Sequence, residues 1–209
     1  MSADFFHEDQ ISGLVCGLDE VGRGPLAGPV VAACVYIPYD VRTHDFIDLI
    51  QDSKKISKSK LSAIHTHIRQ HCVVGIGQCC PREIDTLNIL WASMEAMKRA
   101  YMQASNQMDA PFDHALVDGN RVPPDMPTAA SALIKGDLKS KSIAAASIVA
   151  KYTRDKIMAK LAEDYPHYGW ERNAAYPSKE HLSALQTHGV TPHHRHSFSP
   201  VKKILAARG

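Results

Sequence analysis

The segment 14–28, LVCGLDEVGRGPLAG, restricts the possible folds of this chain more than any other stretch. Its apolar start is typical of a buried strand. The strand ends in two adjacent carboxylates, Asp19 and Glu20, which are almost never fully buried without a cation or hydrogen-bond donors. A glycine-rich loop follows, where backbone N–H groups can approach a phosphate chain closely. Carboxylates beside such a loop indicate metal-assisted phosphoryl chemistry, and a solvated acidic turn is the plainer alternative.

The spacing of Gly22, Gly24 and Gly28 loosely resembles the G-x-G-x-x-G fingerprint of dinucleotide-binding proteins. That fingerprint requires a helix to begin within the glycine loop. Here the loop leads into residues 29–37, PVVAACVYI, whose β-branched and aromatic content predicts a second strand. A nucleotide-cofactor site is therefore a minor alternative.

The composition is that of an ordinary globular chain of one core. Of 209 residues, 44% are hydrophobic and 22% are charged, and the net charge of +2 is too small to indicate nucleic-acid binding by itself. The five cysteines form no C-x-x-C pair, which favours reduced thiols. The sequence shows neither a signal-peptide pattern nor an apolar run of membrane-spanning length. We therefore expect a cytoplasmic protein with no membrane partner.

Hydrophobic periodicity predicts an α/β protein. Strands are expected at residues 14–20, 29–37, 73–80, 114–117 and 129–135. Helices are expected at residues 58–71, from Asn88 onward, and at 141–164, 178–188 and 200–207. We expect Ser57 to cap the first of these helices, Pro81 to end the third strand, and the first two strands to pair as an antiparallel hairpin.

Carboxylates follow three of the predicted strands. Asp19 and Glu20 end the first, Asp118 ends the fourth, and Asp137 comes shortly after the fifth. Open α/β sheets bind ligands at their strand ends. Several carboxylates together can hold two divalent cations about 3.5–4 Å apart for an in-line phosphoryl displacement. Their hard oxygen donors favour Mg²⁺ or Mn²⁺ over zinc.

Motifs along nearly the whole chain resemble those of bacterial ribonuclease HII, in the family's order. They are DEVGRGPLAGPV (19–30), DSKKIS (52–57), EIDTLNIL (83–90), VDGN (117–120), KGD (135–137), AAASIVAKYTRD (144–155) and HHRHSFSPV (193–201). The resemblance implies a ribonuclease H-like α/β fold, with a mixed five-stranded sheet flanked by helices and a short helical C-terminal segment. It also implies one catalytic domain over residues 1–209, in which residues 165–209 contact substrate.

The activity that this resemblance implies is that of an endoribonuclease. It would cut the RNA strand of RNA–DNA hybrids and the 5′ side of single ribonucleotides embedded in duplex DNA, leaving 3′-hydroxyl and 5′-phosphate ends. Asp19, Glu20, Asp118 and Asp137 would be the catalytic residues and would bind Mn²⁺ or Mg²⁺. We expect the enzyme to act as a monomer.

The resemblance also assigns residues that sense the RNA-to-DNA junction. Gly22, Arg23 and Gly24 match the family's loop for the ribose 2′-hydroxyl, a group that both donates and accepts hydrogen bonds. Tyr176 matches the tyrosine that packs on the deoxyribose beyond the junction. The family usually has glycine before this tyrosine, whereas this chain has Ala175. A left-handed backbone at Ala175 would cost about 1–2 kcal/mol.

Several basic and polar residues are candidates for contacts with the nucleic-acid backbone. Lys54 and Lys55 are expected to contact the duplex, although a solvated helix start is an alternative. Arg195 and Ser197 are expected to contact phosphate as part of a polar, histidine-rich segment; a transition-metal site formed by those histidines is the less favoured alternative. Asp155 is expected to form a surface ion pair with a neighbouring Arg154 or Lys151.

Other activities on a related fold remain open. A resolvase- or integrase-like nuclease would act on DNA alone, and a non-catalytic module would bind hybrids without cutting them. Ribonuclease HIII carries an extra domain before the catalytic motif, whereas about fourteen residues precede the first predicted strand here.

Overall fold

The computed structural model describes residues 3–51, 53 and 56–208. Its centre is a five-stranded sheet with the strand order β3-β2-β1-β4-β5. The strands are β1 (Val15–Val21), β2 (Val30–Tyr36), β3 (Val73–Cys79), β4 (His114–Asp118) and β5 (Ala129–Leu133). All of them lie where the hydrophobic pattern predicts strands, so the predicted mixed five-stranded sheet is confirmed.

The central strand β1 separates the antiparallel half of the sheet from the parallel half. It pairs antiparallel with β2, as the predicted hairpin requires, and β2 pairs antiparallel with β3. On its other side β1 runs parallel to β4, which in turn runs parallel to β5. Because β1, β4 and β5 share one direction, their carboxyl ends meet at the same edge of the sheet.

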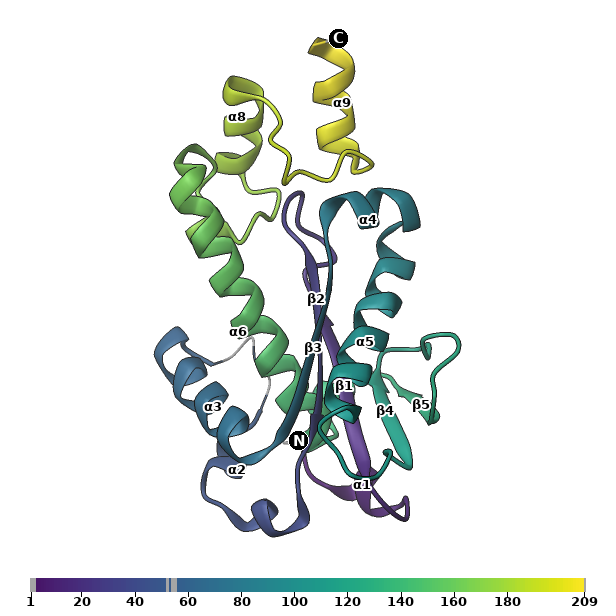
Figure 1. The fold of residues 1–209 in the computed structure, drawn as a ribbon. Coiled ribbons are helices and arrows are strands. Elements are labelled where there is room, and N and C mark those ends of the chain that lie inside the picture. Colours follow the sequence, from purple (N-terminus) through teal and green to yellow (C-terminus); the bar gives the residue numbers. More distant parts are fainter. Residues whose placement is uncertain (1–2, 52, 54–55, 209) are drawn as a thin grey trace.

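Helices cover both faces of the sheet (Figure 1). On one face α6 (Lys141–Asp164) packs on β1 and β2, together with α3 (Lys58–His71) and α2 (Phe46–Leu49). On the opposite face α5 (Ile89–Ser105) packs against β3 and β2. The shorter elements are α1 (Phe6–Asp9), α4 (Pro81–Leu87), α7 (Trp170–Asn173), α8 (Lys179–His188), α9 (Ser199–Arg208), and the 3₁₀ helices η1 (Tyr39–Thr43), η2 (Gly136–Leu138) and η3 (Pro166–Tyr168).

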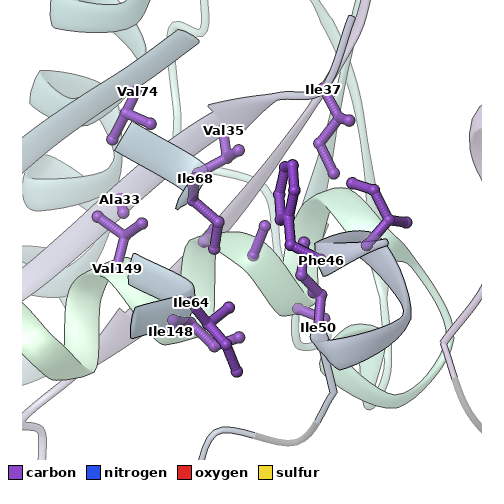
Figure 2. Close-up of a cluster of buried hydrophobic side chains, with 14 of the residues drawn as sticks. Ala33, Val35, Ile37, Phe46, Ile50, Ile64, Ile68, Val74, Ile148 and Val149 are labelled. Atoms are coloured by element: carbon purple, nitrogen blue, oxygen red, sulfur yellow. The ribbon is translucent and has the colours of Figure 1, made fainter. Parts of the chain in front are cut away.

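The apolar core lies on both sides of β2 because successive side chains of a strand point to opposite faces. Ala33 and Val35 face α3 and α6 and belong to one apolar cluster with Ile68 and Ile148 (Figure 2). The alternate residues of β2 pack in a second cluster beneath α5. Each fully buried aliphatic side chain contributes about 1.5–3 kcal/mol, and together these clusters fix the sheet on which the acidic residues stand.

The chain after α6 extends beyond one end of the sheet (Figure 1). A third apolar cluster joins α7, α8 and α9 to the second half of α6 and includes Trp170, Leu185 and Val201. Leu26 and Ala27, from the loop between β1 and β2, belong to the same cluster. The C-terminal helices are thus packed directly against the glycine-rich loop. Among the described residues, no helix combines the length and apolar character needed to cross a membrane.

The helix α4 and the cap of α3 differ from the sequence prediction. Pro81 does follow the last residues of β3, but it also begins α4, because the missing N–H of proline costs nothing in a first helical turn. The Glu83 carboxylate accepts the Cys80 backbone N–H at 2.7 Å and closes that turn. Asn88, with a φ of +65°, separates α4 from α5 and caps α5 as expected. Ser57 occupies the N-cap position of α3, which has the predicted bounds, but its side chain makes no capping hydrogen bond.

Candidate active site

Three of the predicted acidic residues meet where β1 and β4 end. Leu18 of β1 lies opposite Val117 of β4, so the next residues along the two parallel strands, Asp19 and Asp118, reach the same edge. Glu20 follows Asp19 on β1. The Oδ1 atom of Asp118 accepts the Gly136 backbone N–H at 2.7 Å, which fixes η2 at this edge.

All four predicted carboxylates line one cleft of about 280 Å³. Asp137, in η2, completes the set formed by the strand-end residues. The other residues that line this cleft are Val21, Ser53, Ser147, Lys151, Arg154, Asp155, Ala174 and Tyr176. The cleft therefore combines acidic groups from β1, β4, η2 and α6 with basic groups from α6 and with the hydroxyl groups of Ser53, Ser147 and Tyr176.

Burial and mutual repulsion disfavour the ionised state of the acidic residues. Burial raises the pKa of Asp19 well above its usual value, and the neighbouring charges of Glu20 and Asp118 raise it further. Hydrogen bonds from the Ser147 hydroxyl and the Glu20 backbone N–H oppose this shift. Burial also raises the pKa of Glu20, and the Arg23 guanidinium, 3.2 Å from Glu20 Oε1, acts against it.

The donor set of the cleft matches a hard divalent cation. It consists of carboxylate oxygens, and the crowding that raises the pKa of Asp19 is the repulsion that a bound cation relieves. Within the part of the chain that the structure describes, no three His, Cys, Asp or Glu side chains gather closely enough to enclose an ion by themselves. Mg²⁺ ordinarily takes one or two protein carboxylates and completes its shell with waters and substrate oxygens.

The glycine-rich loop rests on a buried arginine rather than on an acidic partner. Arg195 is fully buried, and its guanidinium donates to the backbone oxygens of Gly22, Arg23 and Gly28 at 2.6–3.1 Å. Burial lowers the pKa of Arg195 to about 9, which still leaves it cationic at pH 7. The predicted phosphate contact of Arg195 is therefore corrected: its donors are used inside the protein to shape the loop.

A second buried arginine, Arg154 of α6, joins the same loop to the segment before Tyr176. Its guanidinium donates to the backbone oxygens of Pro29 and Ala27 at 2.9 and 3.0 Å. It also donates to Ala174 O at 3.0 Å. Arg154 was expected as a possible partner of Asp155, but that carboxylate pairs with Lys151 at 2.9 Å instead. The ion pair predicted for Asp155 is confirmed with Lys151.

The structure brings Tyr176 to the glycine-rich loop from far along the chain. A Cβ added at Gly24 would lie 3.3 Å from Cε1 of the tyrosine ring, so the ring covers this glycine directly. Tyr176 is 48% exposed and also lines the acidic cleft. Ala175 has a φ of +63°, which is the left-handed conformation considered from the sequence, and Ala174 before it has a φ of +47°. Two consecutive alanines thus occupy backbone positions that favour glycine.

The remaining predicted contact residues differ in their surroundings. Ser197 is exposed, and both its backbone N–H and its hydroxyl donate to Asp85 Oδ1, at 2.8 and 2.6 Å. His194, from the histidine-rich segment expected to face phosphate, is instead buried and bonded to His181. Lys54 and Lys55 lie outside the described residues.

Sequence reasoning missed the structural use of Arg154, although a signal for it exists. Within the predicted helix 141–164, Arg154 lies four residues after Ala150 and three before Ile157, spacings that place it on one helical face with these two apolar residues. A charged residue on a buried face requires several hydrogen-bond partners. No comparable periodic signal marks Arg195, which lies in a loop.

Comparison with known proteins places the chain among ribonucleases H. Residues 16–201 match the family model described as ribonuclease HII. Ribonuclease HII of Magnetococcus marinus is 52% identical over 191 residues, covering 91% of this chain and 87% of that protein. The crystal structure of ribonuclease H2 from Pyrococcus horikoshii has a TM-score of 0.75 at 25% identity and covers 93% of this chain and 98% of that one. The Mn²⁺ complex of Bst-RNase HIII shares the fold, with a TM-score of 0.71 at 18% identity over 94% of this chain and 70% of that one.

Proposed function

The chain belongs to the ribonuclease HII family and is a ribonuclease H endonuclease, and we propose that it cuts the RNA strand of RNA–DNA hybrids and the 5′ side of single ribonucleotides embedded in duplex DNA. The products would carry 3′-hydroxyl and 5′-phosphate ends. The observation that carries this proposal is the convergence, in one cleft, of four carboxylates with the residue that covers the glycine-rich loop. The four carboxylates suit phosphodiester hydrolysis, and Tyr176 with the loop that it covers suits recognition of a sugar.

Members of this family depend on a divalent metal ion, and we propose Mg²⁺ or Mn²⁺ for this chain. Asp19, Glu20, Asp118 and Asp137 would hold the ion or ions through their oxygen atoms. When bound, such ions supply an activated water and stabilise the charge that develops on the phosphate oxygens. The Gly136 N–H keeps the Asp118 carboxylate oriented toward the cleft edge, and the Glu20 N–H does the same for Asp19 at 2.7 Å.

The glycine-rich loop is proposed to read the ribose. Because the carbonyls of Gly22 and Arg23 are held by Arg195, this loop presents a fixed set of backbone groups. A 2′-hydroxyl both donates and accepts, so Gly22, Arg23 and Gly24 can recognise it through backbone atoms, and deoxyribose offers no such group. Two buried guanidinium groups beneath the loop also provide positive charge that favours the approach of a phosphate backbone.

Tyr176 is proposed to pack on the sugar after the ribonucleotide. Its ring lies directly over Gly24, so the two sugar-reading elements are adjacent. Lys54, Lys55 and the exposed Ser197 are also proposed to contact the duplex backbone. Most direct contacts to a nucleic-acid backbone position the protein and do not select sequence.

The proposal extends to the organisation of the protein. Residues 1–209 would form one catalytic domain, with residues 165–209 as its substrate-contacting helical segment. The enzyme would act as a monomer in the cytoplasm. Light scattering that returns the mass of one chain, 23.0 kDa, supports a monomer, and a mass of twice that value refutes it.

Cleavage of an RNA–DNA hybrid by carboxylate variants tests the proposed site. Asp19→Asn and Asp118→Asn are expected to lower the rate by several orders of magnitude while leaving the far-ultraviolet circular dichroism spectrum unchanged. The matched control is Asp109→Asn, an exposed carboxylate away from the cleft, which is expected to retain the wild-type rate. A near-normal rate in either cleft variant would refute the four-carboxylate site.

A further inference from the structure

Two histidines form a buried pair within the third apolar cluster. His181 of α8 is 0% exposed and His194 is 1% exposed, and their Nε2 atoms lie 3.1 Å apart. Trp170 Nε1 donates to His181 Nε2 at 3.2 Å. Buried imidazoles are tolerated when their ring nitrogens find partners. The proposed chemistry of the cleft makes no use of either ring.

The neighbouring groups define the tautomer of both rings. The Trp170 N–H can only donate, so His181 Nε2 accepts and His181 Nδ1 carries the proton, which it donates to Tyr176 O at 3.0 Å. The Thr191 backbone N–H donates to His194 Nδ1 at 3.0 Å, so His194 Nε2 donates to His181. Burial lowers the pKa of both imidazoles, that of His194 to about 3, which keeps this directed chain of hydrogen bonds neutral at pH 7.

The hydrogen-bonded chain connects two segments that face the substrate cleft. At one end the backbone of His194 forms a bridge with Ala27, at the end of the glycine-rich loop. At the other end lies the backbone carbonyl of Tyr176, whose ring covers Gly24 of the same loop. That carbonyl also accepts the Ser178 N–H at 2.7 Å. The two histidines therefore close a ring of contacts that begins and ends on the loop.

The segment before Tyr176 requires such support. Ala174 and Ala175 both have left-handed backbone conformations, which disfavour alanine relative to an extended or right-handed backbone. Such conformations persist where the surrounding hydrogen bonds determine them. The carbonyl of Ala174 is held by Arg154 and that of Ala175 by the Leu26 N–H at 2.8 Å, so His181 supplies the corresponding bond at Tyr176.

We propose that His181 and His194 are positioning residues that hold the Tyr176 backbone in register with the glycine-rich loop and thereby set selectivity for a ribonucleotide followed by DNA. The inference rests on the proposed function, because it assumes that Tyr176 meets the sugar after the ribonucleotide. The inference goes beyond that function in making the contact of Tyr176 with this sugar depend on the Nδ1–H of His181, whose ring is remote from the substrate.

Two amide substitutions at position 181 separate the hydrogen bonds of this ring. His181→Asn places an amide nitrogen near the Nδ1 position and can still donate to Tyr176 O, whereas His181→Gln places its amide near the Nε2 position and cannot. Both variants are assayed on a duplex containing one ribonucleotide and on an RNA–DNA hybrid. We expect His181→Gln to lower kcat/KM about tenfold on the first substrate and less than about twofold on the second, because only the first places a deoxyribose directly after the ribonucleotide that follows the cut. His181→Asn is expected to stay closer to wild type.

The ratio of the two activities distinguishes positioning from a loss of folding, because an unfolded fraction lowers both rates equally. In a Tyr176→Ala background, His181→Gln is expected to leave this ratio unchanged, since the histidine acts through the tyrosine. An equal loss on both substrates, or an undiminished effect in the Tyr176→Ala background, would overturn the inference. If His181→Gln does not fold, two variants of His194 replace it: His194→Gln keeps a donor at the Nε2 position, and His194→Leu removes it. Only His194→Leu is then expected to shift the ratio of the two activities. A wild-type enzyme that cuts neither substrate would refute the proposed function itself.

Discussion

An alanine at position 22 would test whether Arg154 holds the glycine-rich loop. Gly22 has a φ of +95°, and a Cβ added there would lie 2.2 Å from Arg154 Nε. The backbone conformation alone costs an L-residue about 1–2 kcal/mol. The same Cβ would lie 2.9 Å from the Pro29 backbone oxygen, and relieving the closest contact requires moving Arg154, which is 1% exposed and has little space to move.

Moving Arg154 breaks hydrogen bonds that hold three backbone carbonyls. Arg154 donates to Pro29 O, Ala27 O and Ala174 O at 2.9–3.0 Å. Losing one hydrogen bond to a charged donor costs about 1.5–3 kcal/mol. With one such bond lost and the backbone strain included, Gly22→Ala is expected to lower the free energy of unfolding by about 2.5–5 kcal/mol.

The matched control for this substitution is Gly119→Ala. Gly119 has a comparable φ of +104°, but no atom of the described structure lies within 4 Å of the position of an added Cβ. The control therefore carries backbone strain alone and should lose about 1–2 kcal/mol. Both variants are measured by urea denaturation in metal-free buffer, followed by circular dichroism. Equal losses for the two variants would refute the role of Arg154.

Three further predictions follow from the geometry of the site. Without metal at pH 7, Asp19→Asn should have a higher free energy of unfolding than the wild type. Because the pKa of Asp19 is raised in the native state, wild-type stability falls as pH rises from about 4, the unfolded-state pKa, through the higher native pKa. Urea titrations at several pH values that give parallel stability curves for the two proteins would contradict this. Ala175→Gly should change the free energy of unfolding by less than about 1 kcal/mol, because the relief of left-handed strain is offset by the loss of a buried methyl group and by a more flexible unfolded chain. A loss of stability above about 2 kcal/mol in thermal denaturation would show that the methyl contacts dominate. Fluorescence anisotropy should show that the Asp118→Asn variant binds a labelled RNA–DNA hybrid with an affinity that falls steeply with salt. The association constant should drop by close to one logarithmic unit per tenfold rise in salt concentration for each phosphate contact. An affinity that does not depend on salt would argue against the proposed backbone contacts.

The strands and the acidic residues could be predicted from the sequence because their signals are local. Apolar runs mark β1, β2 and β4, and a carboxylate at a strand end stands out where such a run stops. Register then follows from topology, since parallel pairing of β1 with β4 is sufficient to bring Asp19 to Asp118. The long helix α6 has the predicted bounds, and the Ser140 side chain caps its start by accepting the Ile143 N–H.

The support of the loop could not be predicted because it depends on contacts between distant residues. Arg195 and His194 lie in a polar segment that, taken alone, is typical of an exposed surface. Their burial arises only when α8 and α9 pack against the loop after β1. The left-handed backbone at Ala175 could be suspected from the missing glycine. The Ala175 N–H donates locally to Asn173 Oδ1 at 2.8 Å, but the hydrogen bonds to the carbonyls of Ala174 and Ala175 come from Arg154 and Leu26, which are far away in the sequence.

The most direct test of the proposed activity is cleavage of an end-labelled DNA duplex that contains one ribonucleotide, beside an all-DNA duplex and the Asp118→Asn variant. The site predicts a single cut on the 5′ side of the ribonucleotide, with a 3′-hydroxyl end, that requires Mg²⁺ or Mn²⁺ and is lost in the variant. Equal cutting of the all-DNA duplex, or binding of the ribonucleotide duplex without any cut, would contradict it.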